Sequence, residues 1–327
     1  MKSYLEEILS FNDQLKIGNL KFFNREKLKK MPAPDGIVIT GMGGSGLPSN
    51  LITKLGTSIG LKIPVLPWKD YGLNPCSKTL ENPLFVFISF SGNTEETLSG
   101  LKLLTQKKNR PKIAVIACGG ELKRMAERFR LPFVTFDPQG LTPRQALGYN
   151  YYALIKVLRS VFPKISAKDL SKKINILSLE KPAQALARRI KSRIVLIYTD
   201  SKNSHLGYVW KTNINETAKL PAFTNFFPEI YHNEITAFEK KHFPFFAIFL
   251  IDPQTNKKII KKTKALTKIL NSRKIPTAVL ALSGKNPEEK TWNSIVLSHL
   301  TSFYLAKLNK VNPKATKLID QFKKLSK

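Results

Sequence analysis

The stretch PLFVFISFSGNTEET, residues 83–97, joins an uninterrupted apolar run to a cluster of small polar residues. Residues 84–88 are apolar without polar alternation, which is typical of a strand buried on both faces of a parallel sheet. Gly92 and the asparagine after it permit a tight turn. Thr94, followed by two glutamates, is a typical start of a helix. The stretch therefore predicts a strand, a turn and a helix of an open α/β sheet.

Apolar strands and amphipathic helices alternate on both sides of this stretch. We expect strands at residues 36–40, 63–66, 84–90, 112–117 and 133–136, and again at 193–198, 244–251 and 277–280. We expect helices after Ser45 and Thr94, within 120–129, and at 143–162, 203–220, 254–270, 288–310 and 313–327. This order predicts an α/β protein of two tandem, doubly wound parallel-sheet domains with a helical C-terminus. We place the domains at residues 1–162 and 163–327.

The length of 327 residues allows two domains, and 42% hydrophobic with 24% charged residues is ordinary for a folded chain. The longest apolar run, residues 243–251, is much shorter than the roughly 18 residues that a membrane span needs. The N-terminus is predicted to form a short amphipathic helix and shows no export signal. Cys76 and Cys118 match no metal or redox spacing. We expect a cytoplasmic protein with free thiols, no metal and no membrane partner.

The net charge of +31 allows three kinds of partner, namely nucleic acid, an acidic membrane or an anionic metabolite. The lysines and arginines are spread along the whole chain and form no separate basic arm. This spread favours a solvated, lysine-rich surface over a nucleic acid interface. Such a surface would still attract a phosphorylated substrate.

The sequence GMGGSG, residues 41–46, follows a predicted strand and satisfies the dinucleotide-binding pattern G-x-G-x-x-G. That pattern expects an acid about 20 residues later for the ribose, and Asp70 lies too far on to be convincing. The hydroxyls of Ser89, Ser91 and Thr94 favour a different ligand, since hydroxyls at a helix N-terminus can enclose one phosphate. Helix capping alone would explain Thr94 but would leave both serines without a role. We therefore favour a phosphomonoester over a dinucleotide.

The two loops, GGSG at 43–46 and SFSGNTEE at 89–96, resemble the paired phosphosugar-binding loops of the sugar isomerase (SIS) domain. That superfamily includes isomerases, deaminating synthases, etherases and transcriptional sensors. Residues 211–219 contain the pattern N-E-x-x-K, and residues 227–235 contain P-E-x-x-H-N-E. Both segments resemble the bifunctional phosphoglucose/phosphomannose isomerases, and the similarity extends across essentially the full chain.

The resemblance implies an aldose–ketose isomerase of glycolysis and gluconeogenesis. It would interconvert glucose 6-phosphate or mannose 6-phosphate with fructose 6-phosphate through a cis-enediol, without metal or cofactor. Glu216 would be the base that moves a proton between C2 and C1, and His232 would assist ring opening. Arg144 would stabilise the enediolate, and Lys323 would act on the ring oxygen. Carboxylate, cation and acid–base pair are what this chemistry needs.

The same resemblance implies a substrate pocket and an assembly. The first domain would supply most of the phosphate site and the second domain the base. The implied substrate-binding residues are Gly43, Gly44, Ser45, Ser89, Ser91, Thr94 and Thr316, the last beside C2. The histidine would come from a neighbouring subunit, which implies a homodimer with shared active sites.

Other interpretations stay open at this point. Taken singly, Glu216 would be a solvated helix residue paired with Lys219, and His232 a structural histidine. The chain could be another phosphosugar enzyme on the same scaffold, such as an aminosugar synthase half or a single-substrate isomerase. It could also be a non-catalytic phosphosugar sensor. A sensor should carry a DNA-binding unit, and no such segment is visible.

Overall fold

The structure, a computed structural model, describes residues 2–18, 20–30, 32–240 and 243–326. The chain forms two compact units. The first unit is Phe11–Lys173. The second unit is Ile174–Lys327 together with Met1–Ser10, so the start of the chain groups with its C-terminal half.

The first unit contains a six-stranded sheet in the order β1-β6-β5-β4-β2-β3. Its strands are β1 (Lys21–Phe23), β2 (Ile37–Thr40), β3 (Val65–Trp68), β4 (Leu84–Ser89), β5 (Lys112–Ala117) and β6 (Phe133–Thr135). Five strands are parallel, and β1 pairs antiparallel with β6 at one edge. Strand β1 was not predicted, because three residues are too few to show an alternation.

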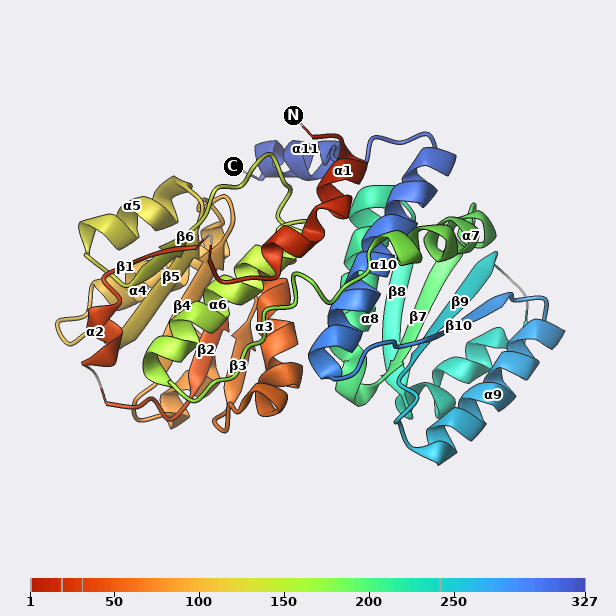
Figure 1. The fold of residues 1–327 in the computed structure, drawn as a ribbon, viewed down its shortest axis with the longest axis horizontal. Helices are drawn as coiled ribbons and strands as arrows, with labels where there is room; N and C mark the ends of the chain where they lie inside the picture. The colour runs from red at the N-terminus through yellow and green to blue at the C-terminus, as the bar shows by residue number, and fades with distance from the viewer. Residues whose placement is uncertain (1, 19, 31, 241–242, 327) are drawn as a thin grey trace. The chain divides into compact units, whose positions relative to one another are not determined.

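Helices cover both faces of this sheet (Figure 1). They are α2 (Glu26–Lys29), α3 (Gly43–Leu55), α4 (Glu95–Thr105), α5 (Gly120–Arg128) and α6 (Leu147–Val161), with 3₁₀ turns at Phe11–Gln14, Gly56–Ile59 and Pro75–Thr79. All six residues of β4 are buried. Phe85 and Phe87 belong to the core under α4 and α5, and their neighbours along the strand face the opposite layer. Two covered faces explain why the strand sequence is continuously apolar.

The second unit contains a four-stranded parallel sheet in the order β10-β9-β7-β8. Its strands are β7 (Ile194–Asp200), β8 (Ala222–Phe227), β9 (Phe245–Ile251) and β10 (Thr277–Ala281). Strand β8 was not predicted. This strand lies at the sheet edge, and its exposed Phe223 and Phe226 break the expected burial alternation.

The helices of the second unit are α1 (Tyr4–Leu9), α7 (Glu180–Ile190), α8 (Ser204–Asn213), α9 (Lys257–Ser272), α10 (Pro287–Leu308) and α11 (Lys317–Leu325). A π-helical turn at Ile214–Ala218 follows α8, and 3₁₀ turns lie at Leu177–Leu179, Ser201–Asn203, Glu229–Tyr231 and Glu234–Phe238. Leu266 and Leu270 of α9 pack into the core on one face of the sheet. Helix α10 packs against both α7 and α8, and most of its length is buried.

Three predicted helices have one end displaced by four residues or more. The helix expected at 203–220 ends at Asn213 and continues as the π-helical turn. The helix expected at 143–162 begins at Leu147, and the one expected at 313–327 begins at Lys317. In both cases the residues after the predicted proline start (Pro143 or Pro313) lie in a segment held by a side chain. Gln145 Oε1 accepts the Thr142 amide, and Asn312 Oδ1 accepts the Lys314 amide. Residue 327 lies outside the described residues.

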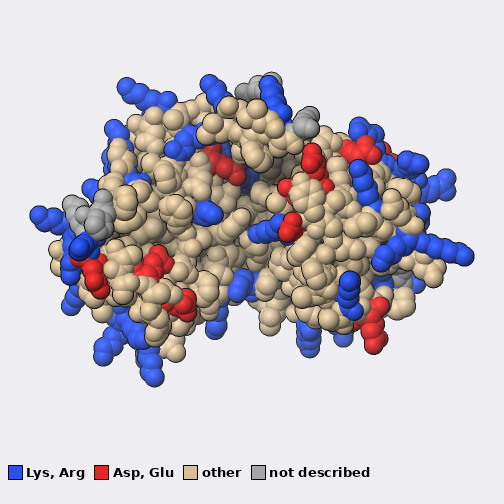
Figure 2. Space-filling model, turned by 180° about the vertical axis from the view of Figure 1, so that it is seen from behind, with Lys and Arg blue, Asp and Glu red and all other residues tan. Residues whose placement is uncertain are grey.

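Figure 2 shows Lys and Arg side chains scattered over the face that it displays, with small groups of Asp and Glu among them. The expected spread of positive charge is therefore visible on this face. Within the described ranges, no helix is long and apolar enough to cross a membrane.

Candidate active site

The hydroxyl-rich loops lie where the strand order of the first sheet reverses. The chain leaves β2 toward β3 on one side, and β4 pairs with β2 on the other side. Open α/β sheets bind ligands at such a point, outside the carboxyl ends of the strands. The loops after β2 and β4 therefore occupy the place where the fold favours a ligand.

The first loop, residues 41–46, is tied directly to the second. The Ser45 side chain is buried, and its Oγ accepts a hydrogen bond of 2.9 Å from the Phe90 amide. Helix α3 begins at Gly43, two residues before the serine. Thus Ser45 couples the start of α3 to the end of β4.

The second loop, residues 89–94, holds its hydroxyls in a fixed pattern. Ser89 Oγ lies 2.9 Å from Thr94 Oγ1 and accepts the Gly92 amide at 3.0 Å. The Ser91 hydroxyl accepts the Asn93 amide at 3.3 Å, and Ser91 itself is exposed. Thr94 occupies the N-cap position of α4, but its side chain makes no capping hydrogen bond. Capping therefore does not account for the Thr94 hydroxyl.

A third loop closes against the second, and glycine is required at the contact. Gly92 has a φ of +74°, and a Cβ there would lie 1.8 Å from the Gly119 carbonyl oxygen. Asn93 accepts the Glu121 amide through Oδ1 at 2.9 Å, across the same contact. The loops after β4 and β5 are thus packed backbone to backbone.

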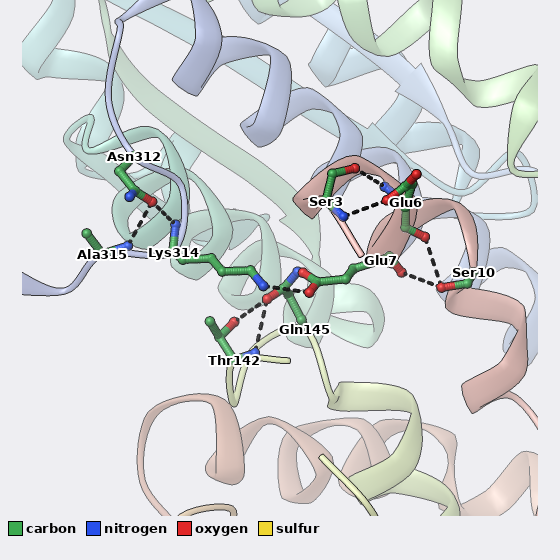
Figure 3. Close-up of polar contacts among 9 residues, drawn as sticks. All are labelled: Ser3, Glu6, Glu7, Ser10, Thr142, Gln145, Asn312, Lys314 and Ala315. Atoms are coloured by element: carbon green, nitrogen blue, oxygen red, sulfur yellow. Dashed lines mark hydrogen bonds and ion pairs between the residues drawn. The ribbon is translucent and has the colours of Figure 1, made fainter. Parts of the chain in front are cut away.

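Arg144 is held beside the first loop by the backbone. A Cβ on Gly44 would lie 2.6 Å from the Arg144 amide nitrogen, so these two backbone segments are in close contact. Gln145 Oε1 accepts the amide of Thr142 at 3.0 Å and its hydroxyl at 2.8 Å (Figure 3). Arg144 is only 1% exposed. In the first unit, one set of candidate residues therefore lies beyond the carboxyl ends of the parallel strands. They are Gly43, Gly44, Ser45, Ser89, Ser91, Thr94 and Arg144.

In the second unit, hydrogen bonds between polar side chains hold α8 in place against α10. Trp210 Nε1 donates to Ser294 Oγ at 3.0 Å, and Asn213 Nδ2 donates to Ser298 Oγ at 2.7 Å. These side chains are buried, where a bond left unmade costs the full desolvation of the group. The end of α8 is therefore held in one position.

The π-helical turn after α8 carries Glu216, which is half-buried. Asn215 Oδ1 accepts the Ala222 amide at 2.8 Å and joins the turn to β8. Asn309 Nδ2 donates to the Ala218 carbonyl at 3.1 Å and joins it to the end of α10. The Lys219 ammonium donates to the Glu216 carbonyl. Glu216 thus sits on a turn anchored from two sides.

His232 is exposed and lies on the loop after β8. Two residues later, Glu234 is held by Tyr198, whose hydroxyl donates at 2.7 Å, and by Asn225 Nδ2, which also donates at 2.7 Å. Burial, and then the Glu234 charge, raise the pKa of the Tyr198 phenol well above its usual range. Tyr198 therefore stays a neutral donor and anchors the histidine loop to the sheet.

Glu216 and His232 lie on segments at opposite ends of strand β8. Helix α8 starts after the carboxyl end of β7 and returns to the amino end of the sheet, where the Glu216 turn precedes β8. His232 follows the carboxyl end of β8. Six residues at about 3.3 Å each separate the two ends by about 20 Å.

The C-terminal candidates are less enclosed. Thr316 is half-buried at the start of α11, and Lys323 is exposed on that helix. Leu318 and Leu325 of α11 are each 80% exposed. The turn with Glu216 and the segment leading to Thr316 both lie at the end of α10, as the Asn309 bond shows. Asn309 was not predicted, because it belongs to no recognisable sequence motif.

The second unit does not repeat the hydroxyl loops of the first. At the last residue of β7, Asp200 Oδ1 accepts hydrogen bonds from the amide and the side chain of Asn203, each at 2.9 Å. After β9, Asp252 forms an ion pair of 2.8 Å with Lys290. Two carboxylates at this edge oppose phosphate binding, which leaves the first unit as the phosphate-binding candidate. The described residues contain no cluster of three or more His, Cys, Asp or Glu that could hold a metal.

A family model for the bacterial phospho-glucose isomerase C-terminal SIS domain matches residues 179–325. The bifunctional phosphoglucose/phosphomannose isomerase of Caldicellulosiruptor bescii is 32% identical over 308 residues, covering 88% of this chain and 88% of that protein. The chain belongs to the bifunctional phosphoglucose/phosphomannose isomerase family. The resemblance inferred from the two sequence motifs is confirmed.

Other comparisons extend beyond this isomerase family. The D-glucosamine-6-phosphate 4-epimerase of Sulfolobus acidocaldarius is 33% identical over 208 residues, 63% of this chain and 64% of that protein. The C-terminal domain of glucosamine-fructose-6-phosphate aminotransferase from Francisella tularensis has a TM-score of 0.72 at 15% identity, covering 96% of this chain and 99% of that one. The predicted fold class, tandem SIS-type α/β domains with a helical C-terminus, is confirmed.

Proposed function

We propose that the protein is an aldose–ketose isomerase that interconverts glucose 6-phosphate and mannose 6-phosphate with fructose 6-phosphate. The observation that carries the proposal is the pair of coupled hydroxyl loops at the strand reversal of the first sheet. Family membership supports the reaction. The protein would act in the cytoplasm, in glycolysis and gluconeogenesis.

The phosphate end of the substrate is assigned to the first unit. Ser45, Ser89, Ser91 and Thr94 would donate hydroxyl hydrogens to the phosphate oxygens, and the first amides of α4 would add backbone donors. Gly43 and Gly44 would let the backbone approach the same group. In the present structure Ser89 and Thr94 bond to each other, and a phosphate would accept from both in place of that bond.

The proton transfer is assigned to the second unit. The Glu216 carboxylate would remove the proton from C2 of the aldose and return it to C1, while the hydroxyl proton moves from O2 to O1, which turns the carbonyl at C1 into one at C2. Arg144 would stabilise the enediolate oxygen. His232 and Lys323 would open the sugar ring, and Thr316 would lie beside C2.

The separation of Glu216 from His232 along β8 supports a homodimer in which a second copy supplies the histidine. Subunit mixing tests this arrangement. Glu216→Gln and His232→Asn should each be inactive alone. Unfolded together and refolded at equal amounts, they should recover about 25% of the wild-type activity, because half of the dimers are mixed and each mixed dimer has one intact site. If both residues came from the same chain, no activity would return.

Product analysis tests the reaction itself. The purified protein is incubated with fructose 6-phosphate without metal or nucleotide, and glucose 6-phosphate and mannose 6-phosphate are quantified separately. Both products should form with the wild type and neither with Glu216→Gln. Glucosamine 6-phosphate is the comparison substrate, because a relative is named as its 4-epimerase. Inversion at C4 of that sugar without formation of either hexose phosphate would contradict the proposal.

A further inference from the structure

The N-terminal helix α1 belongs to the second unit and is closed at both ends by its own side chains. The Ser3 amide donates to Glu6 Oε2 at 2.6 Å, and the Glu6 amide donates back to Ser3 Oγ at 3.3 Å. At the other end, Ser10 Oγ donates to the Glu6 carbonyl at 2.9 Å (Figure 3). Reciprocal capping of this kind gives a short helix a defined start.

One side chain of α1 contacts the turn that carries Glu216. The Tyr4 hydroxyl lies 3.0 Å from Thr217 Oγ1, and this contact is buried. The Tyr4 ring stacks on Phe303 of α10, with centroids 5.8 Å apart and planes 13° apart. Because Thr217 follows Glu216 directly, Tyr4 supports the turn one residue away from the proposed base.

A second side chain of α1 contacts the segment that leads to Thr316. Lys314 Nζ lies 2.5 Å from Glu7 Oε1, and the Glu7 side chain is only 3% exposed (Figure 3). Asn312 Oδ1 accepts the Lys314 amide at 2.9 Å and fixes the local backbone. A carboxylate this deeply buried needs its partner, since removing one member of a buried pair leaves an uncompensated charge.

We propose that Tyr4 and Glu7 are positioning residues, and that α1 holds the Glu216 turn and the Lys314–Thr316 segment at a fixed separation. The inference rests on the proposed function, because it gives α1 a part in placing the base and the C-terminal residues on the sugar. The helix would act through these two segments, which it contacts through Tyr4 and Glu7. Changes in α1 should lower kcat and leave KM nearly unchanged, because binding of the substrate phosphate is assigned to the first unit.

Single substitutions of α1 test this with fructose 6-phosphate as substrate. Glu7→Gln should lower kcat about tenfold and leave KM within about twofold, as expected for small displacements of reacting groups. Tyr4→Phe keeps the stacking, loses the hydroxyl, and should lower kcat about threefold. Adding Lys314→Met to Glu7→Gln should cause no further loss, because both changes remove the same pair.

The matched control is Asp252→Asn, which also removes one negative charge from an ion pair, here the pair with Lys290. This pair lies at the carboxyl ends of the strands of the second sheet, whereas the Glu216 turn lies at their amino ends. The control variant should lower the midpoint of thermal unfolding while kcat stays unchanged. If Asp252→Asn lowered kcat as much as Glu7→Gln at equal loss of thermal stability, the contacts of α1 would be purely structural and the inference would be wrong.

Amide hydrogen exchange gives a readout that does not depend on turnover. Glu7→Gln should accelerate exchange at residues 312–316, and Tyr4→Phe at residues 214–219, whereas Asp252→Asn should change neither segment. Unchanged exchange in both α1 variants would overturn the inference. A wild-type protein without isomerase activity would overturn the proposed function instead, and the exchange data would still decide whether α1 holds these two segments.

Discussion

Gly44→Ala tests whether the first phosphate loop must lie close to the Arg144 backbone. A methyl group on Gly44 would lie 2.6 Å from the Arg144 amide nitrogen and from the Pro143 carbonyl carbon, whereas ordinary contact begins at 3.4 Å. The difference between 3.4 and 2.6 Å means that the loop or the Arg144 segment must move by about 0.8 Å. Both neighbours are backbone atoms, so no side chain can rotate away.

The size of the effect follows from this displacement. Overpacking of a tight contact lowers the free energy of unfolding by about 1–3 kcal/mol. The higher helix propensity of alanine than of glycine offsets up to about 1 kcal/mol of this loss. A shift approaching 1 Å at a site that orients a reacting sugar costs about 100-fold in rate. We therefore expect Gly44→Ala to lose about 100-fold in kcat/KM, with a decrease of about 1–2 kcal/mol in the free energy of unfolding.

Two measurements are made on the same preparations, namely the rate of fructose 6-phosphate turnover and the free energy of unfolding in urea. Gly119→Ala is the control, because its added methyl meets nothing within 4 Å and its backbone is extended. That variant should keep both its stability and its activity. If Gly44→Ala matched the wild type in both measurements, the close packing of the loop on Arg144 would have no functional importance.

Three further predictions concern the supporting structure. Glu234→Gln should lower the free energy of unfolding by about 1–3 kcal/mol, measured in urea, because a carboxylate that accepts two hydrogen bonds is replaced by an amide that must donate. Asn213→Ala should cost a similar amount, about 1–3 kcal/mol, since Ser298 loses its buried donor, and calorimetry would show it. Burial raises the pKa of the Cys118 thiol to about 12, so at pH 8 it stays protonated. Mass spectrometry after iodoacetamide treatment at that pH should find the exposed Cys76 modified and Cys118 unmodified.

The sequence predicted the central strands well, because β2, β4 and β5 are covered on both faces and leave continuous apolar runs. Two of the four edge strands, β1 and β8, were missed, since β1 has only three residues and β8 is partly exposed. The bounds of α8 were wrong for a different reason. Its apolar pattern continues into Ile214, and tertiary contacts of the following turn decide where the α-helix ends.

Residues of the candidate site could be predicted where they belong to a sequence motif. The hydroxyls of Ser89 and Thr94 were expected to act together, and the structure shows them 2.9 Å apart. The role of the N-terminal helix was not predictable, because Glu7 and Lys314 are 307 residues apart in the chain. A short amphipathic helix was expected at the N-terminus and is present as α1, but no local pattern indicates which distant segment the helix contacts.

The most direct test of the central claim is to run the isomerisation of fructose 6-phosphate in D₂O and follow deuterium in the products by NMR. A cis-enediol with Glu216 as the base exchanges its proton with solvent, so deuterium should appear at C2 of glucose 6-phosphate and of mannose 6-phosphate. Glu216→Gln, folded and still binding substrate, should incorporate none. Products free of deuterium, or undiminished exchange in that variant, would contradict the assignment of Glu216 as the base.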